Sequence, residues 1–215
     1  RRLLGFGERF ERRLARAIPR IVAVSEVDAE AFRRLSPGVE VTVVPNGVDV
    51  TQFQPPAAEA DEPPTLLFTG SMGYFPNRDA VGFFCADIWP LIRARRPHVR
   101  FRVVGSDADR YLAHLSGTPG VEILGTVEDM RPVLAGGTVV VVPLRAGSGT
   151  RLKILEAMAM GRAIVSTSVG CEGIEVQSGE HLLVADAPKA FAEAVLNLLE
   201  NPTQRQALGR CARKL

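Results

Sequence analysis

The residues with the clearest potential for chemistry lie between positions 138 and 160. An apolar run, TVVVVPL, leads into the glycine-bearing loop RAGSGT and then into a helix-like segment that starts near Arg151. A glycine loop that feeds a helix presents free backbone amides and the positive end of the helix dipole, and both attract a phosphate. Arg151 and Lys153 add mobile positive charge at the same place. We therefore predict that this segment binds a pyrophosphate group.

Glu156 is a further candidate in the same segment. Most residues from 152 to 160 are apolar or small, which predicts a largely buried helix. A buried carboxylate is costly unless a cation or a ligand hydroxyl satisfies it. Lys153 lies three residues before Glu156 on the same helix face, so two interpretations stay open: the residues contact a ligand, or they form an ordinary ion pair within a helix.

Two common phosphate-binding motifs do not fit this chain. Gly5-Phe6-Gly7 follows no predicted strand and has Phe10 where a third glycine is needed. The segment GSGTRLK lacks the Gly-Lys-Ser/Thr ending of a P-loop. The loop thus suits a phosphate without matching either motif.

Alternating strands and helices must position this loop. Strands are predicted at 65–70, 99–105, 121–125, 138–144, 163–167 and 182–185. Helices are predicted at 77–95, 108–115, 130–134 and 150–160, and two more close the chain. Apolar strands joined by helices predict an α/β fold with a doubly wound, Rossmann-like parallel sheet that is covered on both faces.

The predicted strand ends indicate where a ligand would bind. Ligands of open α/β sheets lie beyond the carboxyl ends of the strands. Three predicted strands end in glycine and a small residue: Gly70-Ser71, Gly105-Ser106 and Gly125-Thr126. Glycine lets a ligand approach the backbone, although it also serves simply to make a tight turn. Together these positions indicate that a ligand would bind at the carboxyl edge of the predicted sheet.

The first 62 residues follow a different pattern. A strand at 20–25, a helix at 26–35 capped by Ser25 and a strand at 41–45 precede the Pro-rich, acidic stretch 53–64. We predict that this stretch is a linker and divide the chain into residues 1–62 and 63–215.

Residues 1–20 have the pattern of a basic amphipathic helix. Seven arginines surround an apolar face made by Leu3, Phe6, Phe10, Leu14 and Ile18. Such a helix either lies on an anionic membrane surface or covers an apolar surface of its own protein.

Composition narrows the function classes. The 26 basic and 24 acidic residues leave a net charge of +2, which argues against nucleic-acid binding and for a small-molecule partner. Cys85, Cys171 and Cys211 lack the spacing of a zinc site or a disulfide framework, so we expect reduced thiols in a cytoplasmic protein. No signal peptide, membrane span or metal cluster is predicted.

Six segments occur in the order of the landmarks of a known family. They are RIVAVSEVDAEAF, VTVVPNGVDVTQF, TLLFTGSM, FRVVGS, VEILGTV and KILEAMAMGRAIVST. Over nearly the whole chain, this pattern resembles the retaining glycosyltransferases of the GT-B fold, family 4 or group 1. GSMGYFPNRDAVGFF and ADIWPLIR are similar to a bacterial subgroup from exopolysaccharide gene clusters. The resemblance implies the C-terminal, donor-binding half of a GT-B fold with a remnant of the N-terminal domain.

The resemblance also implies roles for individual residues. Glu156 would hold the ribose hydroxyls, the loop from Gly149 to Arg151 would face the diphosphate, and the backbone near Val127 would flank the base. The loop from Ser71 to Gly73 would close over the phosphates or the donor sugar. The implied reactive residues are Lys153, Glu156 and Arg151. The implied donor-binding residues are Gly70, Ser71, Met72, Gly105, Val127, Ser148, Gly149 and Thr150.

Two departures from the family pattern affect these roles. The family commonly has a second Glu eight residues before the ribose-binding one, and Ser148 occupies that position here. It also places Arg and Lys after the first strand of the donor domain, where this chain reads GSMGYFPNR. Lys153, Arg151 or Arg78 would have to supply that charge.

Most of the acceptor half of such an enzyme is missing from this chain. That half usually supplies a catalytic histidine, so we expect His98, His114 and His181 to be surface or structural residues. We expect Trp89 to belong to the core.

The function implied for the parent enzyme is sugar transfer from a nucleoside-diphosphate sugar to an acceptor hydroxyl with retention. Negative charge builds on the departing diphosphate, and helix amides with Lys153 and Arg151 would offset it. The acceptor would be a saccharide or lipid-linked saccharide, with no cofactor besides the donor substrate, in the cytoplasm or at the inner face of the membrane. A sugar-nucleotide epimerase and a non-catalytic nucleotide-binding module are the alternatives.

Overall fold

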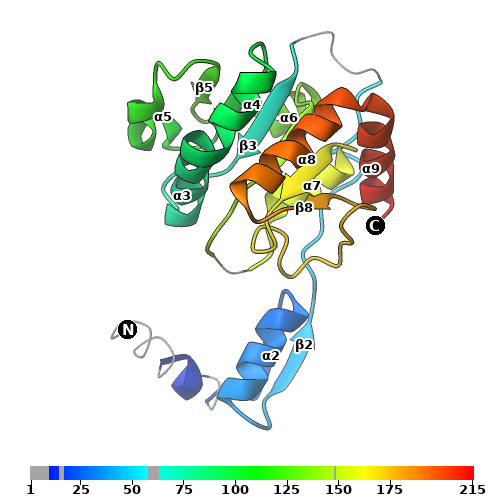
Figure 1. Cartoon of the computed structure of the whole chain (residues 1–215). Coiled ribbons are helices and arrows are strands. Elements are labelled where there is room, and N and C mark those ends of the chain that lie inside the picture. The colour runs from blue at the N-terminus through cyan, green and yellow to red at the C-terminus, as the bar shows by residue number, and fades with distance from the viewer. Residues whose placement is uncertain (1–9, 15–16, 58–62, 148) are drawn as a thin grey trace. The chain divides into compact units, whose positions relative to one another are not determined.

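The computed structural model describes residues 10–14, 17–57, 63–147 and 149–215 (Figure 1). They belong to two compact units. The first contains the described residues up to Gly47 together with 149–150 and 172–175, and the second contains 48–147, 151–171 and 176–215. Ser148, residues 58–62 of the predicted linker, and Leu3 and Phe6 lie outside the described residues. Residues 48–57 group with the second unit, although the sequence places the change of domain at 62.

The first unit is a small parallel β-α-β arrangement. Strands β1 (Arg20–Ala23) and β2 (Glu40–Val43) pair in parallel, and helix α2 (Glu26–Leu35) connects them. Ser25 Oγ accepts the backbone N–H of Asp28 at 3.2 Å, which confirms the predicted helix cap. In the segment before β1, Phe10 is 60% exposed and Leu14 is 44% exposed.

The second unit contains the main sheet. Its strands are β3 (Thr65–Thr69), β4 (Arg100–Val104), β5 (Val121–Leu124), β6 (Val139–Val142), β7 (Ala163–Ser166) and β8 (Leu183–Val184). They run parallel in the order β5-β4-β3-β6-β7-β8. Every residue of β3, β6 and β7 is buried, as expected of central strands that are covered on both faces. The predicted doubly wound α/β fold is confirmed.

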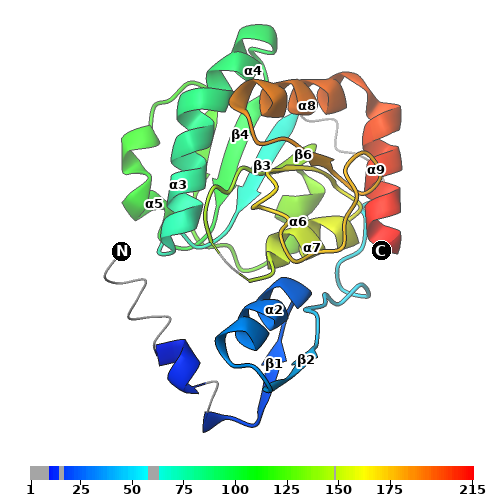
Figure 2. The ribbon, with the colours of Figure 1, turned by 60° about the horizontal axis from the view of Figure 1, so that its bottom comes forward.

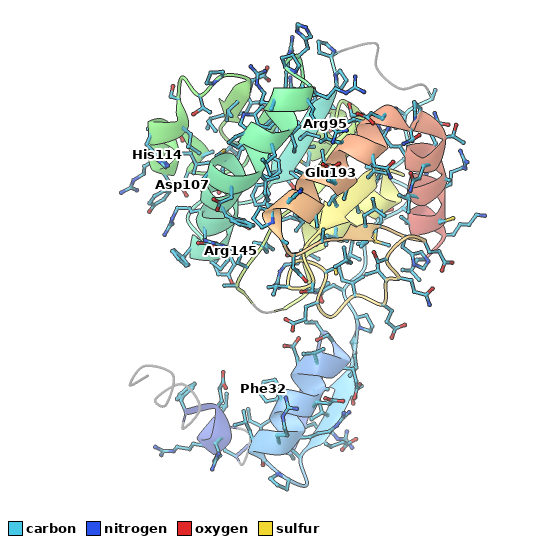
Figure 3. The ribbon with its side chains drawn as sticks, in the orientation of Figure 1. Phe32, Arg95, Asp107, His114, Arg145 and Glu193 are labelled. Carbon is cyan, nitrogen blue, oxygen red and sulfur yellow. The ribbon has the colours of Figure 1, made fainter. Side chains whose placement is uncertain are left out.

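Helices cover the two faces of this sheet (Figures 1 and 2). They are α3 (Phe75–Phe83), α4 (Trp89–Arg95), α5 (Ala108–Tyr111), the 3₁₀ turn η2 (Ala113–Leu115), α6 (Met130–Ala135), α7 (Leu152–Ala159), α8 (Pro188–Glu200) and α9 (Pro202–Lys214). Helix α4 packs against α8, and α7 packs against α9. The Arg95 guanidinium, 2.8 Å from the Glu193 carboxylate, joins α4 to α8 (Figure 3).

The helix predicted at 77–95 is not continuous. Helix α3 passes into the π-helical turn η1 (Phe84–Ile88), and α4 then starts with Pro90 in its first turn. Proline has no N–H to donate, and its ring displaces the carbonyl one turn earlier, so the regular α-helical ladder cannot continue through it. The wider turn brings Phe84 against Phe101, with ring centroids 4.4 Å apart.

The carboxyl ends of β3 and β4 approach each other closely. A Cβ atom on Gly105 would lie 2.0 Å from the carbonyl oxygen of Gly70, and the φ of Gly105 is +151°. Only glycine fits such a contact without displacing the backbone. This edge of the sheet is therefore built for close backbone packing. No helix in the described parts of the chain is long and apolar enough to cross a bilayer.

Candidate functional site

The start of helix α7 has the properties predicted for a phosphate site. Arg151 is the N-cap residue, with φ −88° and ψ 91°, and no side chain among the described residues caps the first turn. The first amides of a helix lack intrahelical acceptors and carry the positive end of the dipole. Gly147 and Gly149 in the preceding loop have φ values of +124° and +77°, which favour glycine.

Lys153 projects from the first turn of α7 toward the end of β3. Its Nζ donates to Asn77 Oδ1 at 2.9 Å and lies 4.0 Å from the centroid of the Phe68 ring. The same Nζ is 2.8 Å from the position that a Cβ on Gly70 would take. Lys153 therefore places its amine beside the loop where the family commonly has Arg and Lys.

The surroundings of Lys153 weaken its hold on the proton. The pKa of Lys153 is lowered to about 7, mainly by burial and also by the charge of Arg151, while the charge of Glu156 acts in the opposite direction. An anion bound next to the amine would favour its charged form. The protonation of Lys153 is therefore sensitive to whether a phosphate is present.

Glu156 is half-buried on α7. Burial raises the pKa of Glu156, and the charge of Lys153 opposes this effect. The ion pair that the spacing allowed is not formed, because Lys153 donates to Asn77 instead. Within the described part of the chain, no hydrogen bond or ion pair engages the Glu156 carboxylate. Its oxygens are thus available to a ligand hydroxyl.

The other two candidate cations are committed to the protein. Arg151 is only 8% exposed and donates from Nη2 to the Val169 carbonyl at 3.4 Å, so it is not the mobile charge that we expected. Arg78 Nη1 donates to the Met72 and Gly73 carbonyls at 2.7 and 3.0 Å. Of the three candidates, Lys153 has the charge that best fits a role in ligand binding.

The loop after β3 is anchored through Met72. The Met72 side chain is fully buried, and its N–H donates to the Ser106 carbonyl at 2.8 Å. Its side chain therefore packs in the core and does not face a ligand, whereas Ser71 and Gly73 on either side are exposed. A loop with a buried Met72 at its centre and exposed residues on either side could lie against a ligand.

The remaining predicted donor residues lie in loops around the same edge or outside the site described here. Gly105 follows β4, and Val127 is half-buried between β5 and α6. Gly149 and Thr150 belong to the first unit, and Ser148 is not among the described residues. Their roles in binding stay predictions.

Two further residues of α3 were not identified from the sequence. Asn77 connects Lys153 to the loop after β3, because its Nδ2 donates to the Ser71 carbonyl at 2.8 Å. Asp79 binds Arg145 through contacts of 2.6 and 3.0 Å, which fastens the loop after β6 to α3. The Pro-Asn pair directly after the first loop is the local signal, but it does not reveal either partner.

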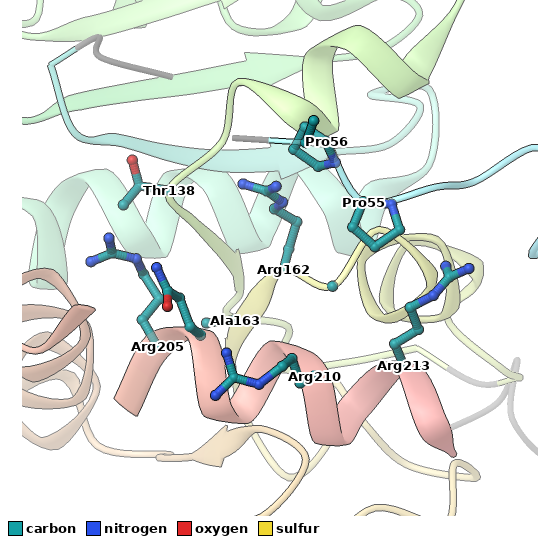
Figure 4. Close-up of a pocket in the computed structure, with 11 residues that line it drawn as sticks. Pro55, Pro56, Thr138, Arg162, Ala163, Arg205, Arg210 and Arg213 are labelled. Atoms are coloured by element: carbon teal, nitrogen blue, oxygen red, sulfur yellow. The ribbon is translucent and has the colours of Figure 1, made fainter. Parts of the chain in front are cut away.

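A pocket of about 310 Å³ lies at the opposite, amino ends of the strands (Figure 4). Thr138 and Ala163, which lie at the starts of β6 and β7, line it together with Arg162, Arg205, Arg210 and Arg213. Arg162 donates to the Gly137 and Met160 carbonyls, and Arg205 donates to the Leu198 carbonyl. Arg213 donates to the Phe53 carbonyl at 2.8 Å. Arg162, Arg205 and Arg213 therefore hold backbone segments together.

The expectations for the histidines and Trp89 are confirmed. His98 and His114 are exposed, and His181 accepts the Gln177 N–H through Nδ1 at 3.1 Å. Trp89 is 3% exposed and donates to the Pro119 carbonyl. Among the described residues, no group of three or more His, Cys, Asp or Glu side chains is placed to hold a metal ion.

The parallel six-stranded sheet and its covering helices are those of a GT-B domain. The family model described as "Glycosyl transferases group 1" matches residues 63–201, so the chain belongs to that family. The D-inositol 3-phosphate glycosyltransferase of Kineococcus radiotolerans is 27% identical over 238 aligned residues, which cover 95% of this chain and 54% of that protein.

Solved GT-B structures share the fold. TarM of S. aureus in a complex with UDP superposes with a TM-score of 0.78 at 17% identity, covering 93% of this chain and 41% of that one. HepE of Anabaena in complex with UDP and glucose gives a TM-score of 0.72 at 16% identity, covering 91% and 57%. The chain spans between 37% and 54% of the length of the curated relatives that it matches.

Proposed function

We propose that this chain is the donor-binding half of an enzyme that transfers a sugar from a nucleoside-diphosphate sugar to an acceptor hydroxyl. The observation that carries the proposal is the Lys153 amine, held beside Gly70 next to the first turn of α7. A diphosphate at this edge would meet an ammonium group and helix amides together. The UDP complexes of TarM and HepE, which share the fold, support a nucleoside diphosphate as the ligand.

The reaction would depend on stabilising the leaving group. When the bond between the sugar and the diphosphate breaks, negative charge accumulates on the phosphate oxygens. The Lys153 ammonium would offset that charge, and Arg151 would hold the loop that feeds α7. Glu156 would bind the ribose hydroxyls through its unpaired oxygens. This scheme uses no metal ion and no cofactor other than the donor substrate.

Finer details belong to the same proposal. Retention of configuration and a role in bacterial polysaccharide or glycoconjugate synthesis follow from the family resemblance. A relative in Klebsiella pneumoniae, named for its place in the cps region, supports such a pathway. The acceptor, a saccharide or lipid-linked saccharide, would bind the half of the enzyme that lies outside this chain. Cys85, Cys171 and Cys211 form no disulfide, which supports a cytoplasmic location. The basic segment before β1 supports peripheral association with the membrane.

Calorimetric titration with UDP, GDP and ADP tests the donor site directly. We expect one of them to bind with a dissociation constant in the micromolar range. The matching monophosphate is the control, and it should bind more weakly because it lacks the second phosphate. Absence of binding by all three diphosphates would contradict the proposal.

The non-catalytic alternative is distinguished by activity of the full-length protein. Ser148 stands where the family has a second Glu, which favours a domain that binds the nucleotide without transferring sugar. Full-length protein that binds a nucleoside diphosphate should release it from the cognate nucleotide sugar in the presence of acceptor. Binding without any such release across a panel of nucleotide sugars and acceptors would support the binding module.

A further inference from the structure

Asn77 occupies a central position at the carboxyl end of β3. It lies in the first turn of α3 and is only 8% exposed. Its Nδ2 donates to the Ser71 carbonyl, and its Oδ1 accepts from Lys153 Nζ. A carbonyl can only accept and an ammonium can only donate, so the two partners together fix the orientation of the amide. One side chain thus connects the loop after β3 to the cation on α7.

Gly70 provides the space for this connection. A Cβ at position 70 would lie 2.8 Å from Asn77 Nδ2 and 2.8 Å from Lys153 Nζ, and the φ of Gly70 is +148°. A larger residue would push both nitrogen atoms away. The absence of a side chain at this strand end therefore lets the amide and the amine sit directly against the backbone.

We propose that Asn77 is a positioning residue of the diphosphate site, which holds the Lys153 ammonium at the end of β3 and fixes the loop that begins at Ser71. This inference rests on the proposed function. An ammonium has three N–H donors, and the bond to Asn77 uses one of them, so two remain for phosphate oxygens. A cation that is already in place does not have to lose side-chain freedom when the ligand binds.

The neutrality of Asn77 is part of this role. The charged groups that act on Lys153 are Arg151 and Glu156, near it on the chain, whereas the groups that contact its Nζ from β3 and α3 are the Phe68 ring and the Asn77 amide. An amide oxygen orients the ammonium without cancelling its charge. An aspartate in the same place would hold Lys153 equally well but would neutralise it and repel a phosphate.

The first test uses the protein without ligand. The chain contains three lysines, Lys153, Lys189 and Lys214, so NMR with lysine labelled at Cε can follow each one as a function of pH. Loss of the acceptor in Asn77→Ala should lower the pKa of Lys153, and the nearly isosteric Asn77→Asp should raise it. Lys189 should titrate identically in all variants. No change in the titration of Lys153 in either variant would overturn the inference.

The second test measures UDP affinity at pH 6 and pH 8.5. Asn77→Ala should weaken binding by roughly tenfold at pH 8.5 and by less at pH 6, where a misplaced amine is still charged. Asn77→Asp should weaken binding at both pH values, because its carboxylate opposes the phosphate. Asn197→Ala, which removes an amide hydrogen-bonded to Gln204 on α9, is the matched control and should bind UDP normally.

The outcomes separate the two proposals. If Asn77→Ala melts at the wild-type temperature and binds UDP as wild type does at both pH values, Asn77 has no positioning role. If the wild-type protein binds no nucleoside diphosphate, the proposed function fails, and the NMR titration alone then decides whether Asn77 sets the state of Lys153. Asn77→Asp keeps the test usable if the alanine variant does not fold.

Discussion

The two ends of the main sheet both gather positive charge, but the protein uses that charge differently at each end. At the amino ends of β6 and β7, the guanidiniums of Arg162 and Arg213 donate to backbone carbonyls and join segments of chain. At the carboxyl end of β3, Lys153 donates to one neutral amide and lies against Gly70. The two ends differ in how many N–H donors of each cation bond to the protein itself. An ammonium that uses only one of its three donors in this way keeps the others for a ligand.

The amino and carboxyl ends of the sheet also differ in geometry. A pocket of about 310 Å³ lies at the amino end. Ligands of an open α/β sheet, however, bind beyond the carboxyl ends of the strands. The carboxyl end combines closely packed glycines with the start of helix α7. A cavity lined by arginines is therefore a weaker indication of a nucleotide site here than a single well-placed lysine.

Removal of the Lys153 amine should have the largest effect on binding. Lys153→Met keeps the aliphatic length and should weaken UDP binding by about 1.5–3 kcal/mol, the usual worth of a hydrogen bond to a charged group. Isothermal titration calorimetry measures the change. Lys189→Met on α8 is the matched control, and an equal loss of affinity there would mean that overall charge matters more than position.

Glu156→Ala should come next. We expect UDP binding to weaken by about 1–3 kcal/mol, because ribose hydroxyls would lose their acceptor. Glu156→Gln keeps one carbonyl acceptor and should lose less. Unchanged affinity in the alanine variant would show that Glu156 does not bind the ligand. Lys153 would then be the main ligand contact on α7.

Arg162→Met tests the other end of the sheet. Because Arg162 donates to the Gly137 and Met160 carbonyls, its loss should lower the free energy of unfolding by about 1–2 kcal/mol. Urea denaturation measures this change. UDP affinity should stay at the wild-type value, and a weakening comparable to that of Lys153→Met would show that the two ends do not differ as described.

The pH dependence of stability and of UDP binding is a separate test of the Lys153 amine. The pKa of Lys153 is lowered by burial from 10.5 to about 7, so the free protein holds fewer protons than the unfolded chain between these values. Stability without ligand should therefore rise with pH between about 7 and 10.5 and stay at its lower value below pH 7, where both states carry the proton. UDP affinity should change in the opposite direction and decline above pH 7, because binding needs the ammonium. Lys153→Met should lack both trends in urea denaturation and calorimetry.

Local patterns predicted much of this protein. The alternation of apolar strands with helices fixed the sheet class, and the valine run of β6 followed by a glycine loop located the start of α7 within two residues. Both depend on neighbours in the chain, where periodicity and propensity act directly. Pro90 carried a signal for the break between α3 and α4, although the continuous apolar pattern obscured it.

The sequence by itself determined the kind of sheet and the segment that carries the positive charge, and it predicted the edge of the sheet at which a ligand would bind. Tertiary structure alone decided which hydrogen-bond partner Lys153 takes. Helix spacing suggested Glu156, three residues away, but the observed partner is Asn77, which lies 76 residues away along the chain. That choice depends on β3 and β6 lying side by side, with α3 and α7 following them. Hydrogen bonds between such distant residues follow from strand order, which local propensities do not specify.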